Sequence, residues 1–354
     1  MEKIVDCGQC GQKLRVRSND RNSFRLEVTC PRCRNSWVQN MGFQSDAAVV
    51  GKPAGGASSD MTGSQEKVLK EISEKINKIR SYTPKVGVFG NSGVGKSSLC
   101  NALFGREVAK IADVEACTRK PQEILIGSNQ SGGGLILVDV PGIGEDPSRQ
   151  KEYTQLYKSL VPELDLVLWA IKADDRNYAS ALDAYATVFG SGRSTPVIFV
   201  ITQVDKTNDS DDWDRVRYMP DGSQLNNISL KEHDVSRRFD VSAKNIISVA
   251  VSKNGKSYNL KSLVDRVVEV LPNEKKYSFT REAKDENVSS EARFVAEKGI
   301  WESVKEMAGD AWDTVKDKVI EKIIESAPEI FNAAAEKAKT VAGKFMGWVG
   351  KFLK

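Results

Sequence analysis

The stretch from Gly90 to Ser97, GNSGVGKS, constrains the fold of this chain more than any other. The segment before it, KVGVFG at 85–90, is apolar and β-branched and predicts a buried strand, while KSSLCNALFG at 96–105 predicts a helix. A strand, a glycine-rich turn ending in Gly-Lys-Ser and a helix are typical of a phosphate-binding loop. The glycines let successive backbone N–H groups surround phosphates, and the helix start adds a favourable partial charge for an anion.

The residue types of the loop suggest separate roles toward phosphate and metal. We expect Lys96 to neutralise the outer phosphates of a nucleoside triphosphate and the Ser97 hydroxyl to ligate Mg²⁺. The loop does not distinguish ATP from GTP. The residues expected to contact the nucleotide here are Asn91, Ser92, Gly93, Val94, Gly95, Lys96, Ser97 and Ser98.

Two later strand ends carry further candidate site residues, and the second of them indicates the base. In LILVDVPGIG, Asp139 follows an apolar run and is expected to support Mg²⁺ directly or through water, while the Gly142 N–H contacts the γ-phosphate. In PVIFVITQVDK, another apolar run ends in Gln203 and Asp205. A carboxylate there can accept hydrogen bonds from N1–H and the 2-amino group of guanine. Adenine lacks both donors and would leave Asp205 unpaired, so the sequence favours GTP.

In this order, GNSGVGKS, DVPG and TQVD resemble a small GTPase domain. They are similar to the Era/TrmE-like branch of bacterial GTPases. SSLCNALFG, ACTRKPQEI, DLVLWAIKADDR and VIFVITQVDK are especially similar to a prophage-associated branch related to immunity-related GTPases. The resemblance covers about residues 84–272, where strand-like runs alternate with helical patterns. It implies an α/β fold with a mostly parallel sheet and helices on both faces, and hydrolysis of GTP to GDP and phosphate.

The resemblance also implies a switch threonine that ligates Mg²⁺ and takes part in catalysis, and Thr118 in ACTRKPQEI is suitably placed. A second guanine-contacting turn should follow a strand and precede a helix. VSAK at 241–244 matches its short signature, with Ser242 as the contact. NIISVAVS is the better strand and NLKSLVDRVVEVL the helix after it, so we prefer the turn with Val251 and Ser252.

Three departures from the family pattern bear on activity. Gln203 stands where many GTPases have lysine, and Ile143 stands where others have a water-orienting glutamine. Gly93 occupies the loop position at which some relatives hold potassium through asparagine, which weakens the case for potassium activation. We therefore expect slow intrinsic hydrolysis, accelerated in trans by a partner or by a homodimer across the nucleotide. A missing arginine alone is worth about 10³- to 10⁵-fold in rate.

Cysteine spacing defines a separate N-terminal block, residues 1–40. CGQC and CPRC form Cys-x₂-Cys-x₁₉-Cys-x₂-Cys, a spacing that resembles zinc ribbons, and a redox dithiol is the alternative. Four thiolates make a closed tetrahedral site that is structural rather than catalytic. KLRVR and FRLEV alternate suitably for a β-hairpin between the two pairs. The expected Zn²⁺ ligands are Cys7, Cys10, Cys30 and Cys33.

The rest of the chain divides by composition and periodicity. Residues 41–64 are rich in Gly, Ala and Ser and predict a flexible linker, and 65–83 predict an amphipathic connecting helix. Residues 273–354 predict a helical module broken at Pro328. Its apolar faces either pack within the protein or, from 299 to 354, engage a protein or an anionic membrane. Related large GTPases couple nucleotide state to helical stalks and membranes.

Bulk properties narrow the functional classes. A net charge of +4 does not indicate a nucleic-acid partner, and no apolar run approaches the length of a membrane span. The first residues lack the apolar core of a secretory signal, so we expect a cytoplasmic protein. If residues 299–354 bind an anionic membrane, the protein would be a peripheral membrane protein. The leading hypothesis is a GTP-hydrolysing switch. The rival is a scaffold that holds nucleotide and engages a partner through its ribbon and C-terminal helices.

Overall fold

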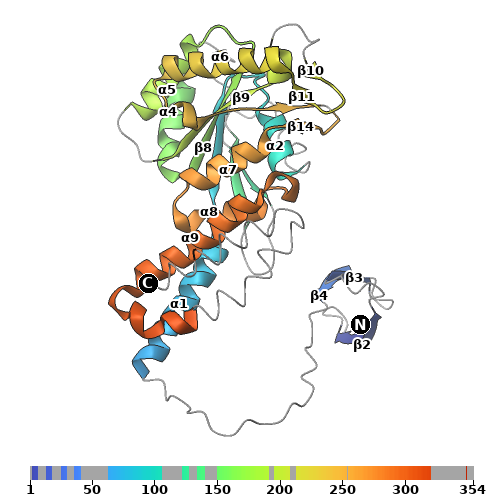
Figure 1. The fold of residues 1–354 in the computed structure, drawn as a ribbon, viewed down its shortest axis with the longest axis vertical. Coiled ribbons are helices and arrows are strands. Elements are labelled where there is room, and N and C mark those ends of the chain that lie inside the picture. Colours follow the sequence, from blue (N-terminus) through green and yellow to red (C-terminus); the bar gives the residue numbers. More distant parts are fainter. Residues whose placement is uncertain are drawn as a thin grey trace. The chain divides into compact units, whose positions relative to one another are not determined.

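The structure, a computed structural model, describes residues 2–6, 13–17, 25–29, 36–40, 63–105, 122–126, 134–139, 150–190, 195–207, 213–252, 254–319 and 348 (Figure 1). The chain divides into two compact units, Met1–Asp60 and Met61–Lys354.

The first unit contains two antiparallel strand pairs. Strand β1 (Glu2–Asp6) pairs with β2 (Lys13–Arg17), and β3 (Arg25–Thr29) pairs with β4 (Ser36–Asn40). This corrects the expected hairpin of KLRVR with FRLEV, because each of these strands pairs instead with its neighbour across a Cys-x-x-Cys segment. The four cysteines predicted to bind zinc lie outside the described residues, and the zinc site stays a prediction.

The second unit is built on one mostly parallel sheet, which confirms the predicted α/β fold. Only its edge strand β6 runs antiparallel, to β7, while the other pairings are parallel. In spatial order the strands are β12 (Ile246–Ser248), β9 (Val197–Thr202), β8 (Leu166–Lys172), β5 (Lys85–Gly90), β7 (Leu135–Asp139) and β6 (Gln122–Ile126).

Helices cover both faces of this sheet (Figure 1). Alternate strand residues point to opposite faces, so Val88 and Leu168 join the core beneath α2 (Lys96–Phe104) and α7 (Leu260–Val270). Phe89 and Trp169 join the core on the other face. The helices on that face are α4 (Gln150–Leu160), α5 (Ala179–Phe189) and α6 (Gly222–Phe239).

Short elements form the connections. Two small antiparallel ribbons, β10 with β11 and β13 with β14, lie beyond the carboxyl ends of β9 and β12 in the chain. The short elements are η2 (Val161–Glu163), η3 (Val204–Lys206), β10 (Trp213–Asp214), β11 (Met219–Pro220), η5 (Ala243–Asn245), β13 (Ala250–Val251), β14 (Ser257–Tyr258), η6 (Asp285–Asn287) and η7 (Gly309–Ala311).

A helical group lies beside the amino ends of the parallel strands and consists of α1 (Gly63–Arg80), α8 (Asn273–Glu282), α9 (Ser290–Ala308) and the helical residues 312–319. Its apolar core joins Ile72 of α1 with Trp301, Trp312 and Val319. In this part of the chain the C-terminal apolar face is therefore buried within the protein. Residues 320–347 and 349–354 lie outside the described residues, and membrane contact there stays a prediction.

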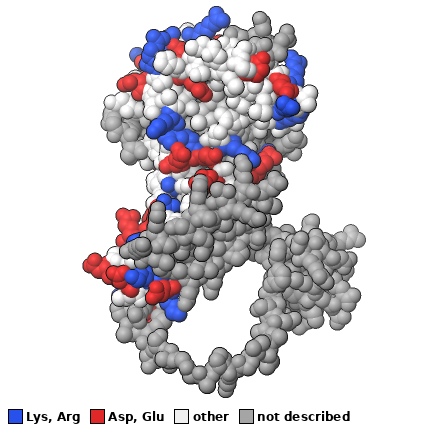
Figure 2. All heavy atoms as spheres, viewed as in Figure 1, with Lys and Arg blue, Asp and Glu red and all other residues white. Residues whose placement is uncertain are grey.

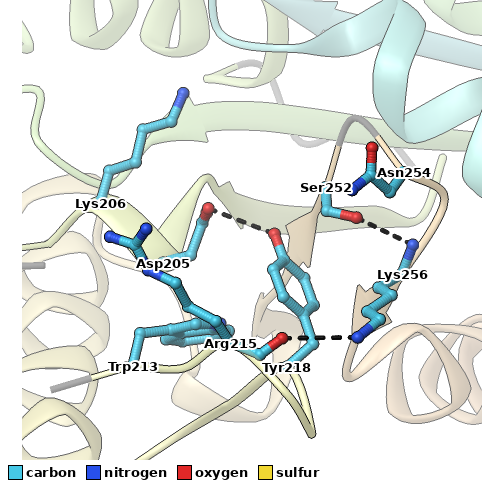
Figure 3. Close-up of a pocket in the computed structure, with 8 residues that line it drawn as sticks. All are labelled: Asp205, Lys206, Trp213, Arg215, Tyr218, Ser252, Asn254 and Lys256. Carbon is cyan, nitrogen blue, oxygen red and sulfur yellow. Dashed lines mark hydrogen bonds between the residues drawn. The ribbon is translucent and has the colours of Figure 1, made fainter. Parts of the chain in front are cut away.

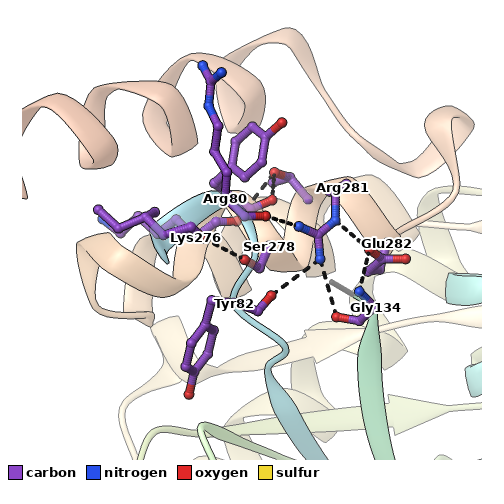
Figure 4. A network of polar contacts seen from close by, with 10 residues as sticks. Arg80, Tyr82, Gly134, Lys276, Ser278, Arg281 and Glu282 are labelled. Atoms are coloured by element: carbon purple, nitrogen blue, oxygen red, sulfur yellow. Dashed lines mark hydrogen bonds and ion pairs between the residues drawn. The ribbon is translucent and has the colours of Figure 1, made fainter. Parts of the chain in front are cut away.

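Arg281 fastens the helical group to the sheet (Figure 4). Its guanidinium donates to the carbonyl oxygens of Arg80, Tyr82 and Gly134, the last two at 3.3 Å, and to the Glu282 carboxylate. Glu282 in turn accepts a hydrogen bond from the Gly134 N–H at 3.2 Å. One residue of α8 thus holds the connection from α1 to β5 and the start of β7.

Charge on the second unit is mixed. Basic and acidic side chains lie interspersed over the described surface in the space-filling view (Figure 2). No helix among the described residues has the length and apolar character needed to cross a bilayer.

Candidate functional site

The phosphate-binding loop lies at the carboxyl end of β5, where its glycines adopt backbone conformations that other residues avoid. Gly90, Gly93 and Gly95 have φ values of 139°, 74° and 91°. A Cβ atom at Gly90 would lie 2.3 Å from the carbonyl oxygen of Ala170 on the neighbouring strand. The loop therefore requires glycine at position 90 for steric reasons as well as conformational ones.

The Lys96 side chain folds back over the loop. Its Nζ donates to the carbonyl oxygens of Gly90, at 3.2 Å, and Asn91, at 3.0 Å. Helix α2 begins at Lys96, so its first backbone N–H groups, which have no carbonyl partner within the helix, lie at the loop. Ser97 and Ser98 belong to this first turn. The lysine ammonium and the helix start together make a cradle for an anion.

The predicted residues 91–94 differ in exposure. Ser92 and Gly93 are exposed at the tip of the loop, whereas Val94 is buried in its base. The side-chain oxygen of Asn91 is buried and has no hydrogen-bond partner among the described residues.

The end of β9 lies against this loop. Thr202 donates through its hydroxyl to the carbonyl oxygens of Val94 and Ile171. Gln203 has a φ of 58°, and its Nε2 donates to the Gly93 carbonyl at 3.3 Å. Lys206 donates to Gln203 Oε1 at 2.7 Å. The structure thus brings together two segments that are about a hundred residues apart in the sequence.

Beyond Gln203 lies a cavity of about 340 Å³ (Figure 3). Asp205 Oδ2 accepts a hydrogen bond from the Tyr218 hydroxyl at 3.2 Å. The other oxygen, Oδ1, is buried and has no partner among the described residues. Such an acceptor is costly unless a ligand or a water molecule satisfies it. The cavity is lined by Asp205, Lys206, Trp213, Arg215, Tyr218, Ser252, Asn254 and Lys256.

Burial raises the pKa of the Tyr218 hydroxyl above its ordinary value, and the charge of Asp205 and the hydrogen bond to it raise this pKa further. The hydroxyl therefore keeps its proton and acts as a donor to the carboxylate. Sequence reasoning missed Trp213 and Tyr218. Their only signal was two aromatic residues soon after Asp205, in a segment without periodicity.

Of the two candidate guanine-contacting serines, Ser252 lines the same cavity as Asp205 and Ser242 does not. Strand β12 runs parallel to β9, so both strands end on the same side of the sheet. Ser242 precedes η5 and β12 and belongs to the opposite side. The Ser252 Oγ accepts a hydrogen bond from the Lys256 N–H at 2.9 Å, which closes the turn beside the cavity. Val251 is the last residue of β13, directly before this turn.

Several predicted metal and switch residues cannot be placed. Thr118, Gly142 and Ile143 lie outside the described residues. Asp139 is the last residue of β7, and its backbone pairs with Val88 of β5, two residues before the loop begins. The backbone therefore brings Asp139 to the carboxyl-terminal end of the parallel strands, where the phosphate-binding loop begins. Serine and aspartate are residue types whose oxygen atoms suit Mg²⁺.

Comparison with known proteins shows similarity over the part of the chain that contains this site. A family model described as 50S ribosome-binding GTPase matches residues 85–203. The uncharacterized protein YkfA of Escherichia coli (strain K12) is 37% identical over 208 residues, covering 58% of this chain and 69% of YkfA. YfjP of the same strain is 44% identical over 139 residues, covering 39% of this chain and 48% of YfjP, so the match spans about half of that relative.

More distant similarities include GTPase Era of Alkaliphilus oremlandii (strain OhILAs), which is 25% identical over 193 residues, 54% of this chain and 57% of Era. Among solved structures, Toc33 from Arabidopsis thaliana in complex with Mg²⁺ and GMPPNP is 16% identical. That alignment covers 63% of this chain and 91% of Toc33, with a TM-score of 0.36.

Proposed function

The chain belongs to the bacterial P-loop GTPases, and on that premise we propose that it binds GTP with Mg²⁺, hydrolyses it to GDP and phosphate, and acts as a nucleotide-dependent switch. The observation that carries this proposal is Asp205, which lines the same cavity as Ser252 and whose buried Oδ1 has no partner among the described residues. The N1–H and 2-amino groups of guanine supply the donors that this carboxylate lacks, and adenine does not.

Each part of the site has a task in this proposal. The loop backbone and Lys96 hold the phosphates, and the Gly142 N–H contacts the γ-phosphate. Ser97, Thr118 and Asp139 are the residues that would hold Mg²⁺, which when bound neutralises charge on the phosphates. Gln203, Asp205, Val251 and Ser252 surround the base. Lys96 already bonds loop carbonyls at about the distance of an ordinary hydrogen bond, so its ammonium is held at the loop for the phosphates.

Hydrolysis by the isolated chain is expected to be slow. Ile143 cannot orient water by hydrogen bonding, and Gly93 offers no side chain for potassium. A group supplied in trans, from a second copy across the nucleotide or from another protein, would complete the site.

Phosphate release tests the enzymatic part. The full chain with GTP and Mg²⁺ should release phosphate, and Lys96→Ala should abolish this release, while Lys70→Ala, at an exposed lysine of α1, serves as the control. Release from GTP no greater than from ATP would overturn the proposal. Turnover per subunit should rise with protein concentration, and a constant value over a hundredfold range would exclude activation by self-association.

A nucleotide-holding scaffold is the second candidate, and Ile143 favours it because an apolar side chain cannot orient water by hydrogen bonding. In that case GDP and GTP bind tightly, and phosphate release stays at the uncatalysed level at every protein concentration. Its contacts would lie in the cysteine block and in the C-terminal segment up to Lys354. The two Cys-x-x-Cys segments each fall between paired strands, which supports Zn²⁺ binding by the block. One equivalent of zinc in the purified chain would agree with it, and a metal-free chain with an intact fold would not.

A further inference from the structure

The ribbon from Trp213 to Pro220 closes one side of the cavity that Asp205 lines. Its strands β10 and β11 pair antiparallel, with Trp213 opposite Pro220. Trp213 and Tyr218 are both buried, and their ring centroids lie 5.3 Å apart. The Trp213 ring also packs edge-on against Tyr258, at 5.5 Å. The ribbon is therefore part of the packed structure around the cavity.

Two sets of hydrogen bonds hold the ribbon in place. Within it, Asp214 Oδ1 accepts from the N–H groups of Val216 and Arg217, at 2.8 and 2.9 Å. Across the cavity, Lys256 Nζ donates to the carbonyl oxygen of Val216 at 2.9 Å. Lys256 Nζ also lies 3.4 Å from the carbonyl oxygen of Arg215, the contact drawn in Figure 3, so the turn that contains Ser252 and the ribbon that contains Tyr218 are joined.

Tyr218 has an uncommon backbone conformation. Its φ of 54° lies in the left-handed region, which aromatic residues rarely adopt. Such conformations persist where the surroundings impose them, and they cluster at functional sites. The result of this one is that the Tyr218 hydroxyl points at Asp205 Oδ2 from within the cavity wall (Figure 3).

We propose that Tyr218 is a specificity-determining positioning residue, which fixes the Asp205 carboxylate so that both its oxygens face the two donors of guanine. This inference rests on the proposed function and names a residue that acts on the base through Asp205. A carboxylate alone rotates easily about its last side-chain bond. With Oδ2 held by the tyrosine, the carboxylate keeps one orientation, and its buried Oδ1, which has no partner among the described residues, is the acceptor left for the base.

The test compares GDP with inosine diphosphate, which lacks the 2-amino group, and with ADP. Tyr218→Phe keeps the ring and removes the hydroxyl. We expect it to lower GDP affinity by up to about tenfold, because the freed carboxylate must then be ordered when the nucleotide binds. The ratio of GDP to inosine diphosphate affinity should also fall by about threefold or more, because a rotating carboxylate no longer meets both donors. Tyr258→Phe, which removes a neighbouring hydroxyl that is not bonded to Asp205, should leave the ratio unchanged.

A double-mutant cycle removes the ambiguity of a folding defect. In an Asp205→Ala background, Tyr218→Phe should have no further effect on GDP affinity, because the group that it positions is gone. An unchanged affinity ratio in Tyr218→Phe, or an equal loss of GDP affinity with and without Asp205, would overturn the inference. If the unaltered chain binds ADP as tightly as GDP, the proposed function itself fails, which is a separate outcome.

Discussion

Replacing Arg281 by methionine should loosen the helical group from the nucleotide-binding sheet. Methionine keeps most of the length and the apolar stem of arginine but has no donors. The guanidinium bonds the carbonyl oxygens of Arg80, Tyr82 and Gly134 and the carboxylate of Glu282. The substitution leaves these acceptors without their donor in a region where the Arg281 and Glu282 side chains are only 23% and 11% exposed.

The magnitude follows from the loss of a largely buried charged partner. A single hydrogen bond to a charged group is worth about 1.5–3 kcal/mol, and four such bonds from one side chain do not add independently. Removing one member of a buried ion pair costs about 3–5 kcal/mol. We therefore expect Arg281→Met to lower the free energy of unfolding by about 3–5 kcal/mol, including the penalty for the unpaired Glu282 carboxylate.

Urea unfolding of the full chain, followed by tryptophan fluorescence, measures this loss. Arg293→Met is the matched control, because Arg293 pairs with an Asp285 side chain that is 95% exposed. That pair should be worth about 1 kcal/mol or less. In a Glu282→Gln background the cost of Arg281→Met should shrink, because the unpaired charge is no longer present. A loss for Arg281→Met as small as that of the control would refute the interpretation of Arg281 as the fastening residue.

Three further outcomes are expected. Gly90→Ala should cost about 3 kcal/mol of stability, measured by urea unfolding, because the added Cβ would meet the Ala170 carbonyl oxygen and strain the backbone; an unchanged midpoint would contradict the loop geometry. Ser252→Ala should weaken GDP binding by about threefold to tenfold, because the hydrogen bond that closes its turn is lost. Ser242→Ala should leave GDP binding unchanged, and fluorescence titration with GDP measures both variants. Burial raises the pKa of Asp265, so the protonated form is favoured in the folded state and stability is lost as pH rises through that raised pKa. Asp265→Asn should therefore be more stable than the parent at pH 7, with a difference that vanishes below the unfolded-state pKa near 3.8; a pH-independent difference would contradict this origin.

The sequence predicted the elements that carry regular signals. The apolar run at 85–90 forms β5, and the helix expected from Lys96 is α2, because burial on both faces and the glycine turn leave few alternatives. NIISVAVS was expected to be one strand but is divided. The chain pairs with β9 over Ile246–Ser248 and then pairs elsewhere as β13. Periodicity does not show where a run of apolar residues leaves the sheet.

The cavity wall and the fastening residue could not be predicted for a different reason. Tyr218 reaches Asp205 through a left-handed backbone conformation, and no residue preference signals tyrosine there. Arg281 lies in a polar segment, and the carbonyl groups that it bonds belong to residues far away in the sequence. Contacts of this kind follow from tertiary packing, which a local pattern does not contain.

The base preference of the Asp205→Asn variant tests the central claim, that Asp205 selects guanine, most directly. Xanthine carries N1–H and a carbonyl in place of the 2-amino group, so it matches the donor and acceptor of an asparagine amide instead of a carboxylate. Competition titrations with GTP and xanthosine triphosphate should show a preference for GTP in the unaltered chain and a reversal in the variant, each by about a hundredfold. A variant that keeps the original preference for GTP would contradict the assignment of Asp205 as the residue that selects the base.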